Sequence, residues 1–295
     1  SGALASGDTV IVNANGTVSV VAETAVAQSV GTAATFKTST PAAIASVYDA
    51  GANRVVIVYG DPNDSDKGKA IVGTVSGTDI SFGSEVVFNA GSTGDKSVTY
   101  DSASQKVVIA YKDGGNSNYG TALVGTVSGT TISFGSEVVF ASSITLAIET
   151  TFDSASNKVV ISYTNQSNSD YGTAIVGTVS GTSISFGTAV VFESAQAFMK
   201  TITFDSTANK VVISYRDLGN SSYGTAIVGT VSSTSISFGT PVVYNSARSD
   251  SNSSTFDSNS NKVVIAYRDD GNSDYGTAIV GTVSGTGISF GSEVV

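Results

Sequence analysis

The chain has 295 residues, a net charge of −10 and neither cysteine nor histidine. Disulfides, zinc sites, thiol nucleophiles and imidazole bases are therefore excluded, and a nucleic-acid partner is disfavoured because phosphate binding depends on Lys and Arg. Charged residues are only 13% of the chain and valine, threonine, serine and isoleucine are abundant, which favours strands over helices. No apolar stretch is long enough for a membrane span, so we expect no membrane insertion.

The first 44 residues predict a partial repeat. TVIVN and TVSVVAE flank Ala14-Asn15-Gly16, which is a typical hairpin signal. SVGTAATF at 29–36 lies 52 residues before SFGSEVVF at 81–88 and predicts a diverged last strand. We expect this segment to supply the second, third and fourth strands of one blade.

Five further copies follow, at 45–96, 97–148, 149–200, 201–252 and 253–295. Residues of one kind recur every 52 positions without a slip, which is typical of a repeat architecture. They are Asp49, Asp101, Asp153, Asp205 and Asp257; Tyr59, Tyr111, Tyr163, Tyr215 and Tyr267; and Phe82, Phe134, Phe186, Phe238 and Phe290.

Each copy contains four predicted strands, which we name a, b, c and d. In residues 202–244 they are ITFD, KVVISYRD, TAIVGTVS and SISFGTPVVY, separated by short polar turns. Four short antiparallel strands per repeat are typical of a β-propeller blade. We therefore predict an all-β chain that forms a single β-propeller domain over 1–295. Six blades, five full and one three-stranded at the N-terminus, are preferred over a five-bladed ring with a separate hairpin.

The tyrosine that ends strand b occurs in every full copy, however far the adjacent loop diverges. A residue that reads a ligand should vary with its loop. We therefore expect Tyr267 and its equivalents to pack in the core.

The segments from strand d to the next strand a keep nine residues but lose all similarity: 37–45, 89–97, 141–149, 193–201 and 245–253. We interpret them as loops of a variable recognition face, and apolar side chains within them favour binding. Neutral drift of exposed loops, or apolar residues that plug the central channel, is the alternative. The candidate ligand-binding residues are Ile144, Leu146, Ile148, Phe198, Met199, Lys200, Arg248 and Asp250.

The b–c loops are expected on the same face. Asp270, Asn272 and Asp274 have the alternate oxygen spacing of calcium loops, but no glutamate completes an EF-hand pattern. Calcium is the one cofactor considered, and a turn that caps its own backbone is the alternative. The tyrosines after these loops either pack or stack on sugars; they are Tyr119, Tyr171, Tyr223 and Tyr275.

Two resemblances follow from the repeated phrases. GNSxYGTAIVGTVSGTSISFG and TFDSxSNKVVIxY resemble the tandem repeats of virion and tail-fibre-type proteins of marine cyanophages. That resemblance implies a virion or extracellular surface, with host-surface glycan or protein and other virion subunits as partners. The units are loosely similar to Asp-box repeats of sialidase-type propellers, although SGTSISFG lacks the Asp-containing turn and Phe replaces Trp. This second likeness supports topology only.

We predict a non-enzymatic binding module that contacts its partner through the variable loops. A purely structural virion or surface protein and a diverged glycan hydrolase are the alternatives. A sialidase-type site needs an arginine cluster, and no motif selects a catalytic pair of carboxylates. The sequence holds only Arg54, Arg216, Arg248 and Arg268.

Overall fold

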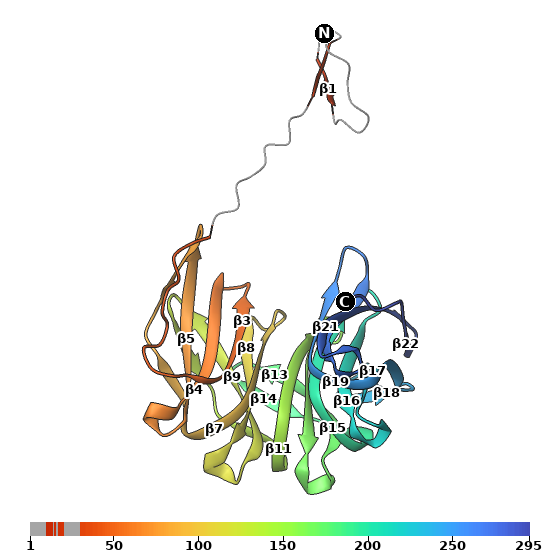
Figure 1. The fold of residues 1–295 in the computed structure, drawn as a ribbon. Helices are drawn as coiled ribbons and strands as arrows, with labels where there is room; N and C mark the ends of the chain where they lie inside the picture. Colours follow the sequence, from red (N-terminus) through yellow and green to blue (C-terminus); the bar gives the residue numbers. More distant parts are fainter. Residues whose placement is uncertain (1–9, 14, 16, 21–29) are drawn as a thin grey trace.

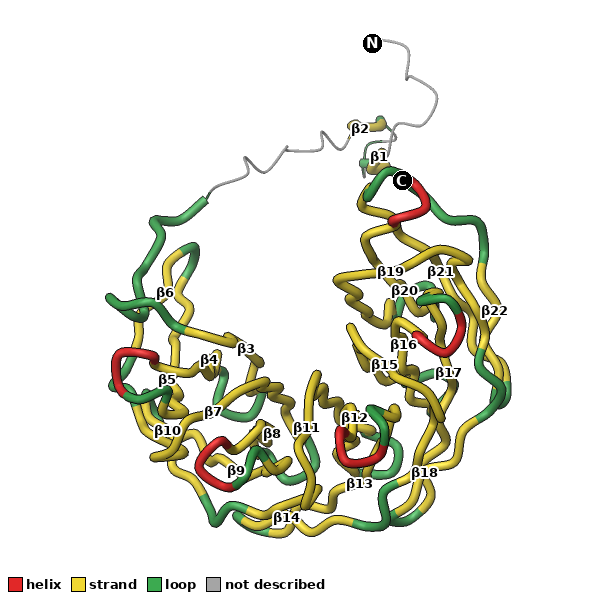
Figure 2. Tube along the Cα trace, turned by 60° about the horizontal axis from the view of Figure 1, so that its bottom comes forward, coloured by secondary structure: helices red, strands yellow, loops and turns green. Residues whose placement is uncertain are grey.

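The computed structural model describes residues 10–13, 15, 17–20 and 30–295. Five four-stranded antiparallel sheets follow one another along an arc around a central axis (Figures 1 and 2). Each sheet is one blade, numbered one to five in chain order. The predicted all-β fold of repeated four-stranded units is confirmed.

The four strands of each blade lie side by side in the order a, b, c and d from the central axis to the rim (Figure 2). Strand a is β3 (Ala42–Asp49) or the second part of β7 (Val86–Asp101), β11 (Val138–Asp153), β15 (Val190–Asp205) or β19 (Val242–Asp257). Strand b is β4 (Arg54–Asp61), β8 (Lys106–Asp113), β12 (Lys158–Asn165), β16 (Lys210–Asp217) or β20 (Lys262–Asp269). Strand c is β5 (Lys67–Ser76), β9 (Tyr119–Ser128), β13 (Tyr171–Ser180), β17 (Tyr223–Ser232) or β21 (Tyr275–Ser284). Strand d begins as β6 (Asp79–Phe82), β10 (Thr131–Phe134), β14 (Ser183–Phe186), β18 (Ser235–Phe238) or β22 (Gly287–Phe290).

A single turn of 3-10 helix joins strand b to strand c in every blade. In four blades the last residue of strand b is an aspartate whose carboxylate accepts hydrogen bonds from this turn; in blade three it is Asn165, which makes no such bond. The turns are η1 (Pro62–Asp64), η2 (Gly114–Asn116), η3 (Gln166–Asn168), η4 (Leu218–Asn220) and η5 (Asp270–Asn272).

Neighbouring blades share one long strand. The start of β7 pairs with β5 of blade one, and its end pairs with β8 of blade two. Where the strand changes partners its register shifts, and the chain adopts positive φ at Ala147 (48°), Met199 (48°) and Ser251 (54°) in the strands that follow.

The prediction that 37–45, 89–97, 141–149, 193–201 and 245–253 are loops is therefore wrong for most of these residues, which lie in β3, β7, β11, β15 and β19. A bulged strand preserves length as strictly as a loop does, because its ladder uses backbone groups and leaves the side chains free.

The recurring aspartate shapes the a–b turn. Asp101 Oδ1 accepts hydrogen bonds from the amides of Ala103 (2.9 Å) and Ser104 (3.0 Å). Its equivalents make the same kind of contact. A short side chain that caps its own turn explains why this residue never changes between copies.

The core lies between blades. The strand-b tyrosines are at most 3% exposed, which confirms that they are packing residues. Tyr111 contacts Phe88 of the preceding strand d with a ring-centroid distance of 5.3 Å. A Cβ added at Gly120 would lie 2.5 Å from the Phe140 ring, so glycine is what allows this aromatic to seat against strand c.

The N-terminal copy is described in two parts. β1 (Val10–Val12) and β2 (Val18–Val20) form the predicted hairpin as a two-stranded sheet that, in the described part of the chain, is separate from the blades. Residues 30–41 form no strand, yet Phe36 packs on Tyr59 (5.5 Å) as Phe88 packs on Tyr111. The strand predicted at 29–36 is therefore not formed over residues 30–36, and residues 21–29 lie outside the described residues. Among those described, no helix is long and apolar enough to cross a membrane.

Candidate functional site: pockets between blades

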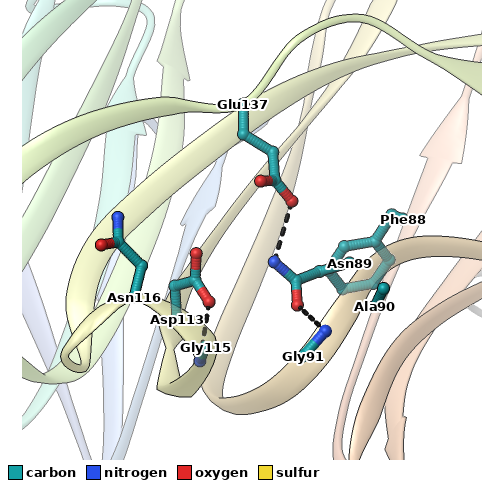
Figure 3. A pocket seen from close by; sticks show the side chains of 8 residues that line it. All are labelled: Phe88, Asn89, Ala90, Gly91, Asp113, Gly115, Asn116 and Glu137. Carbon is teal, nitrogen blue, oxygen red and sulfur yellow. Dashed lines mark hydrogen bonds between the residues drawn. The ribbon is translucent and has the colours of Figure 1, made fainter.

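A polar pocket of about 660 Å³ lies at the junction of blades one and two. Strand d of blade one contributes Asn89, while blade two contributes Asp113 and Glu137 (Figure 3). We name it the Asn89 pocket; its lining residues are Phe88, Asn89, Ala90, Gly91, Asp113, Gly115, Asn116 and Glu137.

The local backbone structure positions each polar side chain of the pocket. Asn89 pairs with Gly68 where β7 leaves blade one, and its Oδ1 accepts from the Gly91 amide at 2.7 Å. Asp113 ends β8 and accepts from the Gly115 amide at 3.0 Å. Glu137 lies in the break between β10 and β11, so its side chain can reach toward the preceding blade.

One hydrogen bond connects the two blades across the pocket, and a second holds the same acceptor within blade two. Glu137 Oε1 accepts from Asn89 Nδ2 (2.8 Å) and from the Tyr111 hydroxyl (2.7 Å). Burial and the bond to Glu137 raise the pKa of Tyr111, so the phenol remains a donor. Burial, followed by the charge of Glu137, raises the pKa of Asp113 above its usual range.

The same set recurs between blades four and five. Asn245, Asp269 and Glu293 line a pocket of about 410 Å³, and each lies 156 residues after its counterpart. Asn245 Nδ2 donates to Asp269 Oδ1 (2.9 Å), and the Tyr267 hydroxyl donates to Glu293 (2.7 Å). We name this the Asn245 pocket.

Of the two junctions between these pockets, one lacks the whole set and the other lacks part of it. Blades two and three carry Ala141, Asn165 and Ala189 at the equivalent positions. Blades three and four carry Glu193, Asp217 and Pro241. Glu193 accepts from the Tyr215 hydroxyl at 2.9 Å, so a carboxylate there reaches the tyrosine from the other blade.

The equivalent position before blade one carries lysines. Lys37 takes the place of Asn89, and its Nζ lies 2.7 Å from Asp61 and 3.0 Å from Glu85. Lys69 Nζ lies 2.7 Å from Asp61 as well. Hydrogen bonds from Lys37 and Lys69 lower the pKa of Asp61 to about 2. We name this the Lys37 site.

The predicted ligand-binding residues are not brought together on one exposed face. Ile148 and Lys200 are at most 4% exposed, whereas Ile144 and Met199 are 36% and 44% exposed. Leu146 and Phe198 are half-buried. Register shifts with a positive φ at Ala147 and at Met199 interrupt the alternation of side chains along these strands, so Ile144 and Ile148 differ in exposure although they are four residues apart. Their role as ligand contacts stays a prediction.

Asp250 is nearly buried among three arginines. It is bonded to Arg216 and lies 2.9 Å from Arg248 and 2.7 Å from Arg268. Arg268 also contacts Asp270 (3.2 Å) and Asp274 (3.7 Å).

These arginines bear on the predicted calcium site at Asp270, Asn272 and Asp274. The carboxylates face guanidinium groups, which would repel a metal ion. Within the described residues, no three Asp or Glu side chains are grouped so that they could hold a metal ion.

The loop tyrosines lie at the start of strand c and line neither pocket. Tyr119, Tyr171 and Tyr223 are half-buried, and Tyr275 is 56% exposed. Sugar stacking by these rings is not tested by this arrangement.

The sequence analysis did not select Glu137 and Glu293, which line the two pockets. Both lie in a part of strand d that otherwise hardly changes between copies. The available signal was that glutamate at this position accompanies asparagine 48 residues earlier, at Asn89 and Asn245.

Comparison with known proteins supports the architecture. No protein-family model matches the chain, and no curated protein matches it significantly. Among solved structures, BP39L lectin from Burkholderia pseudomallei matches with a TM-score of 0.64 and 12% identity over 86% of this chain and 70% of the lectin. A variant of Aleuria aurantia lectin in complex with α-methyl-L-fucoside matches with 0.52 and 13% over 85% and 77%. AofleA from Arthrobotrys oligospora matches with 0.51 and 9% over 86% and 70%. At these identities the likeness shows the fold alone, that of propellers related in architecture to six-bladed lectins.

Proposed function

We propose that the chain is a non-enzymatic carbohydrate-binding module that holds one sugar residue in the Asn89 pocket and one in the Asn245 pocket. The observation that carries this proposal is the repetition of one polar set at two junctions of an otherwise uniform scaffold. Packing does not require that set, because the junction of blades two and three is built without it.

The chemistry of the set suits sugars. Sugar hydroxyl groups both donate and accept hydrogen bonds, and the pockets offer carboxylate acceptors beside an amide. Their volumes, about 660 and 410 Å³, lie in the usual range of roughly 300–1,000 Å³ for small-ligand sites. The structural likeness to lectins, one of them holding a fucoside, supports the same ligand class.

We extend the proposal to the setting implied by the sequence resemblance. The module would lie on a virion or cell surface and contact a host-surface glycan. The virion setting is supported by the repeated phrases alone.

Titration calorimetry with soluble glycans tests the two-site proposal. Wild type should bind two sugars per chain. Asn89→Ala combined with Glu137→Ala imitates the junction of blades two and three and should leave one site. The reverse triple change, Ala141→Asn, Asn165→Asp and Ala189→Glu, should create a third.

If the Asn89→Ala, Glu137→Ala variant still binds two sugars per chain at an unchanged melting temperature, the pockets are excluded as sugar sites. Analysis of the titrated glycan for cleavage products separates binding from the hydrolase alternative. Intact glycan is expected.

A further inference from the structure

The Lys37 site is the counterpart of the Asn89 pocket before blade one, and it contains a lysine ammonium group between its two carboxylates. Asp61 and Glu85 correspond to Asp113 and Glu137, each displaced by 52 residues. Lys37 Nζ lies between them at 2.7 and 3.0 Å. The Tyr59 hydroxyl donates to Glu85 at 2.5 Å, just as Tyr111 donates to Glu137. The glutamate is therefore held by the same hydrogen bond in the two sites.

The two open pockets keep the carboxylates but lack the cation. Asparagine replaces Lys37, and the counterparts of Lys69 are Thr121 and Thr277. Among the described residues, no lysine or arginine lies within ion-pair distance of the four pocket carboxylates. Each pocket therefore presents two acidic groups without the counter-charge that its homologue has.

The buried aspartate presents an acceptor to the pocket. Asp113 and Asp269 are each 4% exposed. One oxygen of Asp113 accepts from the Gly115 amide, and Figure 3 shows the other pointing away from that amide, to the side where Glu137 lies. A cationic donor there would form charge-assisted hydrogen bonds, which are stronger than neutral ones.

We propose that the Asn89 and Asn245 pockets select sugars with a free amine, the ammonium group of a non-acetylated hexosamine binding between the aspartate and the glutamate. This inference rests on the proposed carbohydrate function and names its ligand class. Calcium fits less well, because it prefers six to eight oxygen ligands and Asn89 Oδ1 is already engaged by the Gly91 amide. The net charge of −10 also favours approach of a cation.

The experiment compares the methyl glycosides of glucosamine, galactosamine and mannosamine with their N-acetyl forms, by calorimetry at neutral pH. At least one of the three amino sugars should bind about tenfold more tightly than its N-acetyl form. This ratio corresponds to the free-energy difference between a charged and a neutral hydrogen bond. Asp113→Asn with Asp269→Asn removes one of the two carboxylates that flank the amine and should abolish this preference.

A lysine graft supplies the matched control. Asn89→Lys with Asn245→Lys copies the Lys37 site and should abolish amino-sugar binding without lowering the melting temperature. Ala141→Lys, placed at a junction that lacks both carboxylates, should leave it unchanged.

If sugars with a free amine and their N-acetyl forms bind with equal affinity, the amine assignment is wrong and the proposed carbohydrate function remains. No binding by any sugar would overturn both. Binding of Nα-acetyl-lysine amide in place of every amino sugar would overturn the sugar part and assign the pockets to protein amines.

Discussion

The junction of blades one and two and the junction of blades two and three have the same backbone plan but different side chains. One carries Asn89, Asp113 and Glu137, and the other carries two alanines and Asn165. The aromatic contact beneath is the same in both, with ring centroids 5.3 Å apart. Scaffold and site are therefore separable in this protein: strands and aromatic pairs hold the blades together, and three positions decide what a junction presents.

The substitutions with the largest expected effect on stability test the packing that both junctions share. Tyr111→Ala and Tyr163→Ala each remove a buried aromatic and should each lower the free energy of unfolding by about 3–5 kcal/mol. Chemical denaturation measures both. A much smaller loss for Tyr163→Ala would mean that the polar set, rather than packing, stabilises the first junction.

A second test concerns the close approach of blades. Gly120→Ala places a Cβ 2.5 Å from the Phe140 ring, and this overpacking should cost about 1–3 kcal/mol. Gly276 is its counterpart in blade five, where an added Cβ meets no described atom within 4 Å. Gly276→Ala should change the melting temperature little; equal losses in the two variants would contradict the role given to the aromatic ring.

The third test removes one hydroxyl at each junction. Tyr111→Phe deletes the donor to Glu137 and should cost about 1.5–3 kcal/mol, the usual net value of a hydrogen bond to a charged group. The Tyr163 hydroxyl has no hydrogen-bond partner among the described residues, since Ala189 replaces the glutamate. Tyr163→Phe should therefore be nearly neutral in the same denaturation assay.

The smallest effect is a pH dependence. Because the folded-state pKa of Asp113 is raised by burial and by Glu137, the folded chain retains this proton to a higher pH than the unfolded chain does. Stability from this group is therefore lost as pH rises above about 4, the unfolded pKa. Asp113→Asn copies Asn165 and should gain stability relative to wild type over that window in thermal melts. A constant difference at all pH values would show that Asp113 titrates normally.

The repeat period was sufficient to predict the blades. A strand order that recurs every 52 residues leaves few ways to bury two apolar faces, and even Phe36 in the diverged copy packs on Tyr59 as its spacing predicts. The long strands were not predicted, because Ala141 to Glu149 owe their conformation to backbone pairing with two different blades. Their own sequence contains little sign of it.

The site was only half predictable, for a geometric reason. Asn89 and Asp113 lie in segments that the sequence marks as variable or loop-forming, but Glu137 lies in a segment that hardly changes between copies. Their meeting depends on how one blade packs on the next. Inspection of a single copy cannot show it, whereas comparison of the same positions across copies points to it.

The shared strand has a consequence for how such a chain can grow. Asn89 is encoded in the copy at 45–96, while Asp113 and Glu137 are encoded in the copy at 97–148. A lone copy therefore encodes two of the three positions of one junction and one of the three positions of the next, and no complete set. Each duplication of a unit adds one junction, and each junction draws its composition from two ancestors that can mutate independently. Under the proposed function, the number of possible binding sites rises with the number of copies, while the residues of each site come from a pair of neighbouring copies.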